Sequence, residues 1–177
     1  MLIKPFETER LLIRPLESSD AEDLFLLDQN PEVMKYIGIS PLTEVAQSEK
    51  VIQMIINQYE KFGIGRYAVI ERESGTFIGW SGLKLNDEKV FEHQNFYELG
   101  YRFLPDYWGK GYAQETANAF IQKGFDALNL PEIFAYAHSE NKASINTLQK
   151  VGFTKTGEFM EPDGLCYWYE IKNNKNN

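Results

Sequence analysis

The stretch Phe103-Leu104-Pro105-Asp106-Tyr107-Trp108-Gly109-Lys110-Gly111-Tyr112-Ala113 joins a predicted strand to a predicted helix. Asn95 to Phe103 alternates between two faces as a strand does, and Pro105 ends it. Gly111 to Leu128 carries apolar residues at helical spacing. Because a helix begins with N–H groups that lack intrahelical partners, and glycine lets the backbone approach an anion, this stretch predicts a phosphate-binding turn. Lys110 adds a positive charge to it.

Three phosphate-binding motifs can occupy such a junction. A dinucleotide site requires a third glycine, but Gln114 stands where it would follow Gly109 and Gly111. No segment matches the glycine-rich loop with a Lys-Ser or Lys-Thr end that binds nucleoside triphosphates. The third motif, the acyl-CoA signature, has Gln or Arg, two residues, Gly, one residue, then Gly or Ala. Gly111 and Ala113 fit its last two positions, whereas Trp108 departs from the first.

The remaining elements extend outward from this turn to both ends of the chain. Asn30-Pro31 ends the first predicted helix. The order of elements predicts an α/β (α+β) fold, in which a mixed, mostly antiparallel central sheet is flanked by helices on both faces. We expect a single domain over residues 1–171 and a frayed polar tail over 172–177. The other predicted strands are Leu11–Pro15, Arg66–Glu71, Phe77–Leu85, Glu132–Ala137, Phe153–Met160 and Leu165–Ile171, and the other predicted helices are Ala21–Asp28, Thr43–Phe62 and Lys142–Val151.

Composition excludes several functional classes. The net charge of −8 repels phosphate backbones and anionic lipids, so neither nucleic acid nor a membrane is an expected partner. No stretch approaches the ~20 apolar residues of a membrane-spanning helix. One cysteine and two histidines are too few for a metal centre built on those residues, so we expect no metal. The lone Cys166 fits a reducing, cytoplasmic location.

Three segments together resemble one known family. They are Glu7-Thr8-Glu9-Arg10-Leu11-Leu12-Ile13-Arg14-Pro15-Leu16, Glu98-Leu99-Gly100-Tyr101 through Ala113, and Asn141-Lys142-Ala143-Ser144 with Gly152-Phe153. On these segments the chain is similar to the GCN5-related N-acetyltransferase (GNAT) superfamily, in its RimJ/RimL-like branch. The resemblance covers nearly the whole chain.

The resemblance implies an acetyl-CoA-dependent N-acetyltransferase in which an amine attacks the thioester directly. It also implies that the Asn95–Phe103 strand splays from Glu132–Ala137, which frees the strand end near Tyr101 and Phe103 to bind the pantetheine arm. Asn141 is expected to contact pantetheine and to cap its helix. The residues expected to bind acetyl-CoA are Tyr101, Phe103, Leu104, Trp108, Gly109, Lys110, Gly111, Tyr112, Ala113 and Asn141.

Two residues are the predicted catalytic groups. An amine attacks only when it is neutral, and Glu98 on the central strand is the predicted base, with an ion-paired structural glutamate as the alternative. Ser144 is the predicted proton donor to the thiolate, with a simple place in the first helical turn as the alternative. Leu148 stands seven residues after Asn141, where many relatives carry a tyrosine thought to protonate the thiolate. The general acid is therefore open.

The acceptor is also open at this point. A protein N-terminal α-amine, a small amine, a polyamine and an aminoglycoside all remain open. The resemblance implies that the acceptor pocket is built from variable loops, such as Asn30–Leu42 and Asp87–His93. A catalytically inactive CoA-binding module that acts as a sensor or interaction partner is the main alternative function, and a nucleotide-binding protein is the second. The chain is expected to be a monomer or a homodimer.

Overall fold

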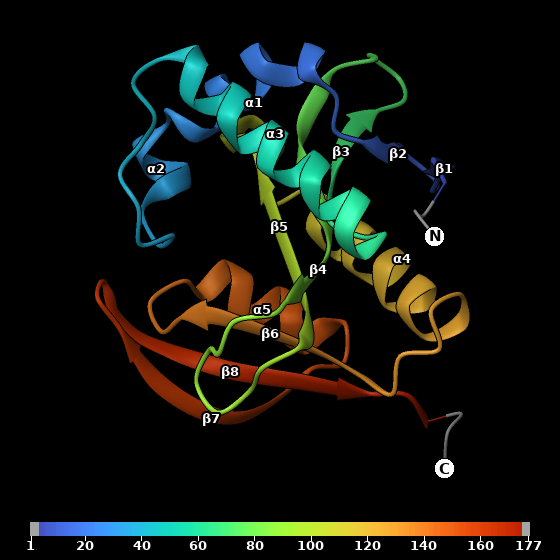
Figure 1. The fold of residues 1–177 in the computed structure, drawn as a ribbon, viewed down its shortest axis with the longest axis vertical. Helices are drawn as coiled ribbons and strands as arrows, with labels where there is room; N and C mark the ends of the chain where they lie inside the picture. Colours follow the sequence, from blue (N-terminus) through green and yellow to red (C-terminus); the bar gives the residue numbers. More distant parts are fainter. Residues whose placement is uncertain (1–3, 175–177) are drawn as a thin grey trace.

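A computed structural model describes residues 4–174 and contains one eight-stranded sheet (Figure 1). The strand order across the sheet is β1-β2-β3-β4-β5-β6-β8-β7. The elements are β1 Phe6–Glu7, β2 Leu11–Pro15, the 3₁₀ turn η1 Ser18–Asp20, α1 Ala21–Asp28, α2 Pro31–Met34, α3 Val45–Phe62, β3 Arg66–Glu71, β4 Phe77–Asn86, β5 Phe96–Phe103, the 3₁₀ turn η2 Pro105–Tyr107, α4 Tyr112–Asp126, β6 Glu132–His138, α5 Lys142–Lys150, β7 Thr154–Glu161 and β8 Gly164–Lys172.

The sheet is antiparallel except where β5 meets β6. β4 and β5 stay in register from Asn86 opposite Phe96 to Gly79 opposite Phe103. By contrast, β5 and β6 share a single pair in register among the described residues, Glu98 opposite Phe134. Beyond Glu98 the two strands diverge, which confirms the expected splay and the expected mixed, mostly antiparallel sheet.

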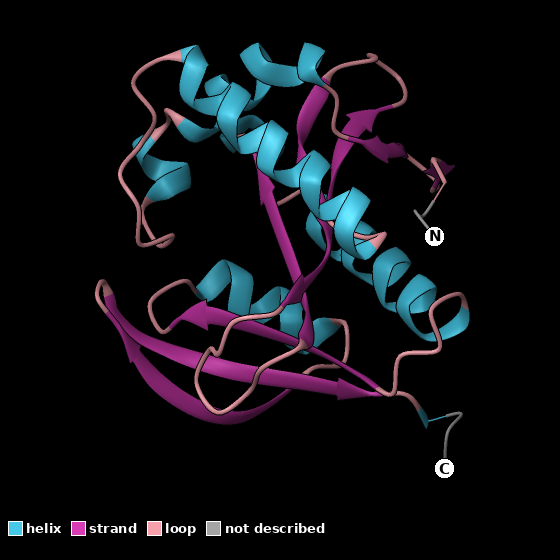
Figure 2. Cartoon of the chain, in the orientation of Figure 1, coloured by secondary structure: helices cyan, strands magenta, loops and turns pink. Residues whose placement is uncertain are grey.

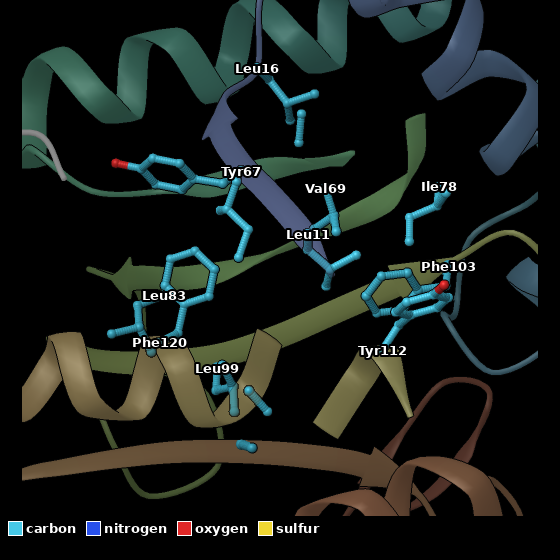
Figure 3. Close-up of a cluster of buried hydrophobic side chains, with 14 of the residues drawn as sticks. Leu11, Leu16, Tyr67, Val69, Ile78, Leu83, Leu99, Phe103, Tyr112 and Phe120 are labelled. Atoms are coloured by element: carbon cyan, nitrogen blue, oxygen red, sulfur yellow. The ribbon is translucent and has the colours of Figure 1, made fainter. Parts of the chain in front are cut away.

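Helices cover both faces of this sheet. α3 crosses one face of the upper strands, and α4 runs along the opposite face (Figures 1 and 2). Phe120 of α4 packs its ring 5.6 Å from that of Tyr67, and Figure 3 shows both within the main cluster of buried side chains. A smaller aromatic cluster is formed by Phe96 of β5, Phe134 of β6 and Trp168 of β8. None of the helices within residues 4–174 is long and apolar enough to cross a bilayer.

The structure departs from the sequence-based expectations at several boundaries. Asn30-Pro31 ends α1 as predicted but also begins α2, because Asn30 accepts a hydrogen bond from the Glu32 N–H (2.9 Å) and Pro31 suits a first helical position. The two-residue strand β1 was not predicted. The tail was expected to begin at Lys172, but β8 includes Lys172, and the Asn173 side chain is buried and donates to the Leu130 carbonyl (3.2 Å). Residues 175–177 of that predicted tail lie outside the described part of the chain.

Candidate active site

The turn between β5 and α4 places an array of backbone donors at the start of a helix. Gly109 and Gly111 have φ angles of +71° and +83°, in the left-handed region that favours glycine. Within residues 4–174, no acceptor receives a hydrogen bond from the backbone N–H groups of Gly109 through Gln114. These donors and the positive end of the α4 dipole make the turn an anion site.

Trp108 closes this turn from the side. Its indole Nε1–H donates to the Phe103 carbonyl (2.7 Å), while 48% of its surface stays exposed. The bond fixes the end of β5 against the turn, and it uses the Phe103 carbonyl oxygen. A tryptophan at this position thus has a structural explanation that its departure from the sequence signature did not suggest.

The free edge of β5 is set by the alternation of its backbone groups. The Leu104 N–H donates to the Ile78 carbonyl of β4 (2.9 Å). Because backbone direction repeats every two residues, the backbone N–H and C=O of Arg102 also face β4. Those of Tyr101 and Phe103 face the opposite edge, where β6 has diverged. The Tyr101 N–H and C=O and the Phe103 N–H are therefore open for a ligand that lies along this edge.

An ion-pair network that sequence reasoning did not find anchors the turn to the N-terminal segment. Glu115 in the first turn of α4 accepts from the Thr8 hydroxyl (2.5 Å), the Arg10 backbone N–H (3.0 Å) and Arg10 Nε (2.7 Å). Arg10 Nη1 also donates to the Lys110 carbonyl (2.8 Å). Thr8 and Arg10 were noted only as part of a family resemblance, because their partners lie about a hundred residues away in the sequence.

Two cavities meet where β5 and β6 part. The larger one, about 530 Å³, runs along the turn and the start of α5. The smaller one, about 210 Å³, lies at the gap between the strands and is lined by Glu98 and by Tyr136 of β6. The residues that line both cavities are Tyr36, Ile37, Tyr101, Arg102, Asn141 and Ser144. This junction can bring together a long ligand in the larger cavity and a small one in the smaller cavity.

Glu98 lies buried in the smaller cavity with both carboxylate oxygens bound. Arg66 pairs with Oε1, and Asn86 Nδ2 donates to Oε2 (2.7 Å). Burial opposes the charged form, but the positive charges of Arg66 and Lys84 and these hydrogen bonds outweigh it, so the pKa of Glu98 lies below its usual range. Glu98 is therefore an anion at neutral pH and a weak base.

Tyr101 brings a hydroxyl to the junction of the two cavities. Its oxygen lies 3.2 Å from Ser144 Oγ, and burial raises its pKa to about 12. Asn141 Oδ1 accepts from the Ser144 N–H (3.1 Å), so the predicted helix cap is present. Leu148 also lines the smaller cavity, and it offers no hydroxyl there. The phenol of Tyr101, whose hydroxyl was not predicted to act, lies next to the predicted serine.

His138 lines the same cavity but has both ring nitrogens engaged by the backbone. Nδ1 accepts from the Glu140 N–H (3.2 Å), which assigns the proton to Nε2 and makes it the donor to the Asp163 carbonyl (3.2 Å). The ring also stacks on Tyr36 at 5.2 Å. These contacts connect the end of β6 to the loop after α2 and to the β7–β8 turn. His138 thus has a structural role in closing the cavity.

Most of the predicted site residues line one or both cavities. Leu104 and Lys110 do not line either cavity: the Leu104 N–H is bound to β4, and Lys110 Nζ lies 5.1 Å from the Tyr107 ring centre. No group of three or more acidic, histidine or cysteine side chains in residues 4–174 is arranged to hold a metal ion. The predicted residues that line the larger cavity are Tyr101, Phe103, Trp108, Gly109, Gly111, Tyr112, Ala113, Asn141 and Ser144.

Comparison with known proteins points to one family. The model of the acetyltransferase (GNAT) domain matches residues 10–154. The uncharacterized N-acetyltransferase p20 of Bacillus licheniformis is 37% identical over 150 residues, which cover 85% of this chain and 82% of that protein. Spermidine N(1)-acetyltransferase of Escherichia coli (strain K12) is 28% identical over 148 residues, covering 84% and 75% of the two chains. The crystal structure of a GNAT-family acetyltransferase from Bacillus anthracis superposes with a TM-score of 0.81 at 28% identity and covers 95% of this chain and 98% of that one.

Proposed function

Since the chain belongs to the acetyltransferase (GNAT) family, we propose that it transfers the acetyl group of acetyl-CoA to a primary amine by direct attack of the amine on the thioester. The observation that carries this proposal is the junction of the two cavities between β5 and β6, with the Tyr101 and Ser144 hydroxyls at the meeting point. Acetyl-CoA is the co-substrate of the family and supplies an activated acyl group.

The groups that line the larger cavity support its proposed role in binding coenzyme A. The free N–H groups from Gly109 onward suit the oxygens of a pyrophosphate. The open Tyr101 C=O and Phe103 N–H suit the amides of the pantetheine arm, since an extended ligand can pair with a free strand edge. Asn141, which lines both cavities, is the proposed further contact to this arm.

The charge that develops during the reaction requires two kinds of stabilisation. We assign the backbone N–H of Tyr101 to the oxygen of the thioester carbonyl, where negative charge grows as the amine attacks. We assign the Tyr101 and Ser144 hydroxyls to the departing sulfur. A phenol with a pKa of about 12 keeps its proton at neutral pH. An alkyl thiol has a pKa of about 8.5, so the phenol stabilises the thiolate by donating a hydrogen bond rather than by giving up its proton.

Glu98 acts on the acceptor amine through its charge. Its lowered pKa makes it a poor proton acceptor, but a fixed anion in the smaller cavity stabilises the positive charge that the nitrogen gains on attack. The proton that the nitrogen loses then passes to solvent. Removal of that proton by Glu98 itself, directly or through water, is the competing assignment, and the pH dependence of a Glu98 variant separates the two.

The acceptor class and the setting are further parts of the proposal. The primary amine belongs to a small molecule or to a protein N-terminus, as the RimJ/RimL-like opening segment suggests. The protein acts as a monomer or homodimer in the cytoplasm, where a lone buried thiol stays reduced.

One experiment tests the proposed function. Release of the CoA thiol from acetyl-CoA is followed with a panel of primary amines, and calorimetry measures binding of CoA and of ATP. We expect CoA binding, no ATP binding, and thiol release that depends on an amine. CoA binding without turnover on any amine would point to a binding module instead. Binding of ATP without CoA would overturn the assignment of the turn.

A further inference from the structure

The two arginines that line the smaller cavity differ in how many of their donors the protein uses. Arg66 uses both of its terminal nitrogens: Nη1 donates to the Gly82 (2.6 Å) and Glu98 (2.9 Å) carbonyls, and Nη2 pairs with the Glu98 carboxylate. Its guanidinium lies across Gly100, where a Cβ would come within 2.7 Å of Nη2. Arg66 therefore serves the architecture of the cavity.

Arg102 uses only one of its three nitrogens. Nη1 donates to Asp28 Oδ1 (2.6 Å) and contacts Met34 Sδ (3.4 Å). Nε–H is buried and has no acceptor, and Nη2 donates to no residue in the described part of the chain. The guanidinium stacks on Trp80 at 4.9 Å, which holds its plane in place. A guanidinium with unused donors, fixed by a ring and one carboxylate, is prepared to bind an oxygen ligand.

The unused groups around the cavity favour an acceptor with an anionic group over one with a second amine. Glu98 is the one acidic residue among the described residues that line it, and Arg66 and Asn86 occupy both of its oxygens. The second amine of a polyamine would therefore find no free carboxylate here. Although the whole chain has a net charge of −8, two arginines face this cavity against one glutamate. Asp28 offsets the charge of Arg102 without using its Nε–H or Nη2, so these unused donors, and not a net positive charge, are what attracts an anion.

We infer that Arg102 binds a carboxylate on the acceptor, so that the acceptor is a small primary amine of the amino-acid class. The inference rests on the proposed transfer to a primary amine and adds its substrate class. Arg102 lines both cavities, so a carboxylate bound to it leaves the amine of the same molecule close to the junction where the thioester would lie. The cavity of about 210 Å³ matches a molecule of this size.

The first test uses the unaltered protein and pairs of substrates that differ only in the carboxylate. L-leucine is compared with isopentylamine, L-phenylalanine with phenethylamine, and spermidine serves as the polyamine. We expect kcat/KM to be at least tenfold higher for the amino acid in one or both pairs. Equal or better use of the decarboxylated amines, or a preference for spermidine, would overturn the inference. A preference for L-leucinamide or the dipeptide Leu-Gly over L-leucine would also contradict it, because neither presents a carboxylate beside the amine.

The second test removes the guanidinium of Arg102, the proposed hydrogen-bond donor to the carboxylate. Arg102→Gln leaves Asp28 buried without its partner, so the substitution is also made in an Asp28→Asn background, and D28N alone is the control. We expect R102Q in the D28N background to abolish the preference for the carboxylate, with KM for acetyl-CoA changed less than the selectivity. A preference that survives would refute the role of Arg102. If no amine supports turnover, calorimetry of L-leucine with the CoA-bound protein tests the carboxylate site separately from the proposed acetyl transfer. Binding that is tenfold weaker in the double variant than in D28N supports the carboxylate site. No L-leucine binding to the unaltered protein rejects it.

Discussion

Replacing Gly109 by alanine tests whether the turn before α4 binds the pyrophosphate. The chain offers a matched control in Gly75, at the turn between β3 and β4. The two glycines have φ angles of +71° and +70°, and neither has an atom within 4 Å of the position that a Cβ would take. The backbone strain of the two substitutions is therefore the same, and only Gly109 lines a cavity.

The expected magnitudes follow from this match. An alanine in the left-handed region costs about 1–2 kcal/mol, which lowers Tm by roughly 2–8 °C in a chain of this length, equally for G109A and G75A. At position 109 the methyl group also enters the larger cavity beside the free N–H groups. Loss of one charge-assisted hydrogen bond is worth about 1.5–3 kcal/mol, so KM for acetyl-CoA should rise roughly 10- to 100-fold in G109A alone.

The assay combines thermal unfolding with thiol release at varied acetyl-CoA and a fixed, saturating amine. G75A reports the strain, and the difference between the two variants isolates binding of the co-substrate. If G109A loses the same stability as G75A and keeps the KM of the unaltered protein, the turn does not bind the pyrophosphate and the reasoning is refuted.

Three further predictions concern the remaining site residues. Glu98→Gln leaves Arg66 buried without a counter-ion and should cost about 3–5 kcal/mol of unfolding free energy. The pKa of Glu98 is lower in the folded protein than its ordinary value of 4.5. The charged Glu98 therefore stabilises the fold fully above pH 4.5, and this stabilisation is lost as the pH falls through the folded pKa. Urea unfolding should thus be less acid-sensitive in E98Q. The pH dependence of the residual kcat/KM should match that of the unaltered protein, whereas loss of its acidic limb would make Glu98 the base. Tyr101→Phe should lower kcat about 10- to 100-fold without raising KM for acetyl-CoA, measured by thiol release. The pKa of Tyr101 is raised from 10 to about 12 in the folded state, so the unaltered protein loses stability as the pH rises from 10 to 12. Between pH 9 and pH 11, urea unfolding should show a smaller loss of stability for Y101F than for the unaltered protein. Arg10→Ala should raise KM for acetyl-CoA by about 3- to 10-fold with kcat nearly constant, since one or two hydrogen bonds that hold the turn are lost. Arg72→Ala, which breaks an exposed contact of the same N-terminal segment, is the control, and equal effects of the two variants would contradict a specific role for Arg10.

The order of the longer strands and helices was readable from the sequence because it depends on local patterns, whereas the short β1 and α2 were missed. Alternation in β5, helical spacing in α3 and α4, and the break at Pro105 each act within a few residues. The glycine turn before α4 is a local signal of the same kind. These signals were sufficient for the fold class, while the family and the co-substrate were predicted from the resemblance of three segments. They placed the end of β8 too early, because this segment is held by residues distant in the sequence: Asn173 donates to the Leu130 and Pro131 carbonyls.

The chemistry of the acceptor side depended on contacts that no local pattern encodes. Glu98 was correctly placed on the central strand, but its low pKa comes from Arg66, which lies 32 residues away in the sequence. The meeting of Tyr101 with Ser144 and of Arg102 with Asp28 likewise joins distant segments. A side chain's charge state and its unused donors depend on which neighbours fill the space around it.

The sequence alone predicted an anion-binding turn at Gly109–Ala113, because the N–H groups of that turn belong to consecutive residues. The family resemblance then identified acetyl-CoA as the co-substrate. The tertiary structure decided how that turn is held by Arg10 and Glu115, and how β5 separates from β6 to open two cavities. It also decided which arginine in the smaller cavity keeps free donors. These features arise from packing between elements remote in the chain, and burial in that packing sets the strength of their electrostatic interactions.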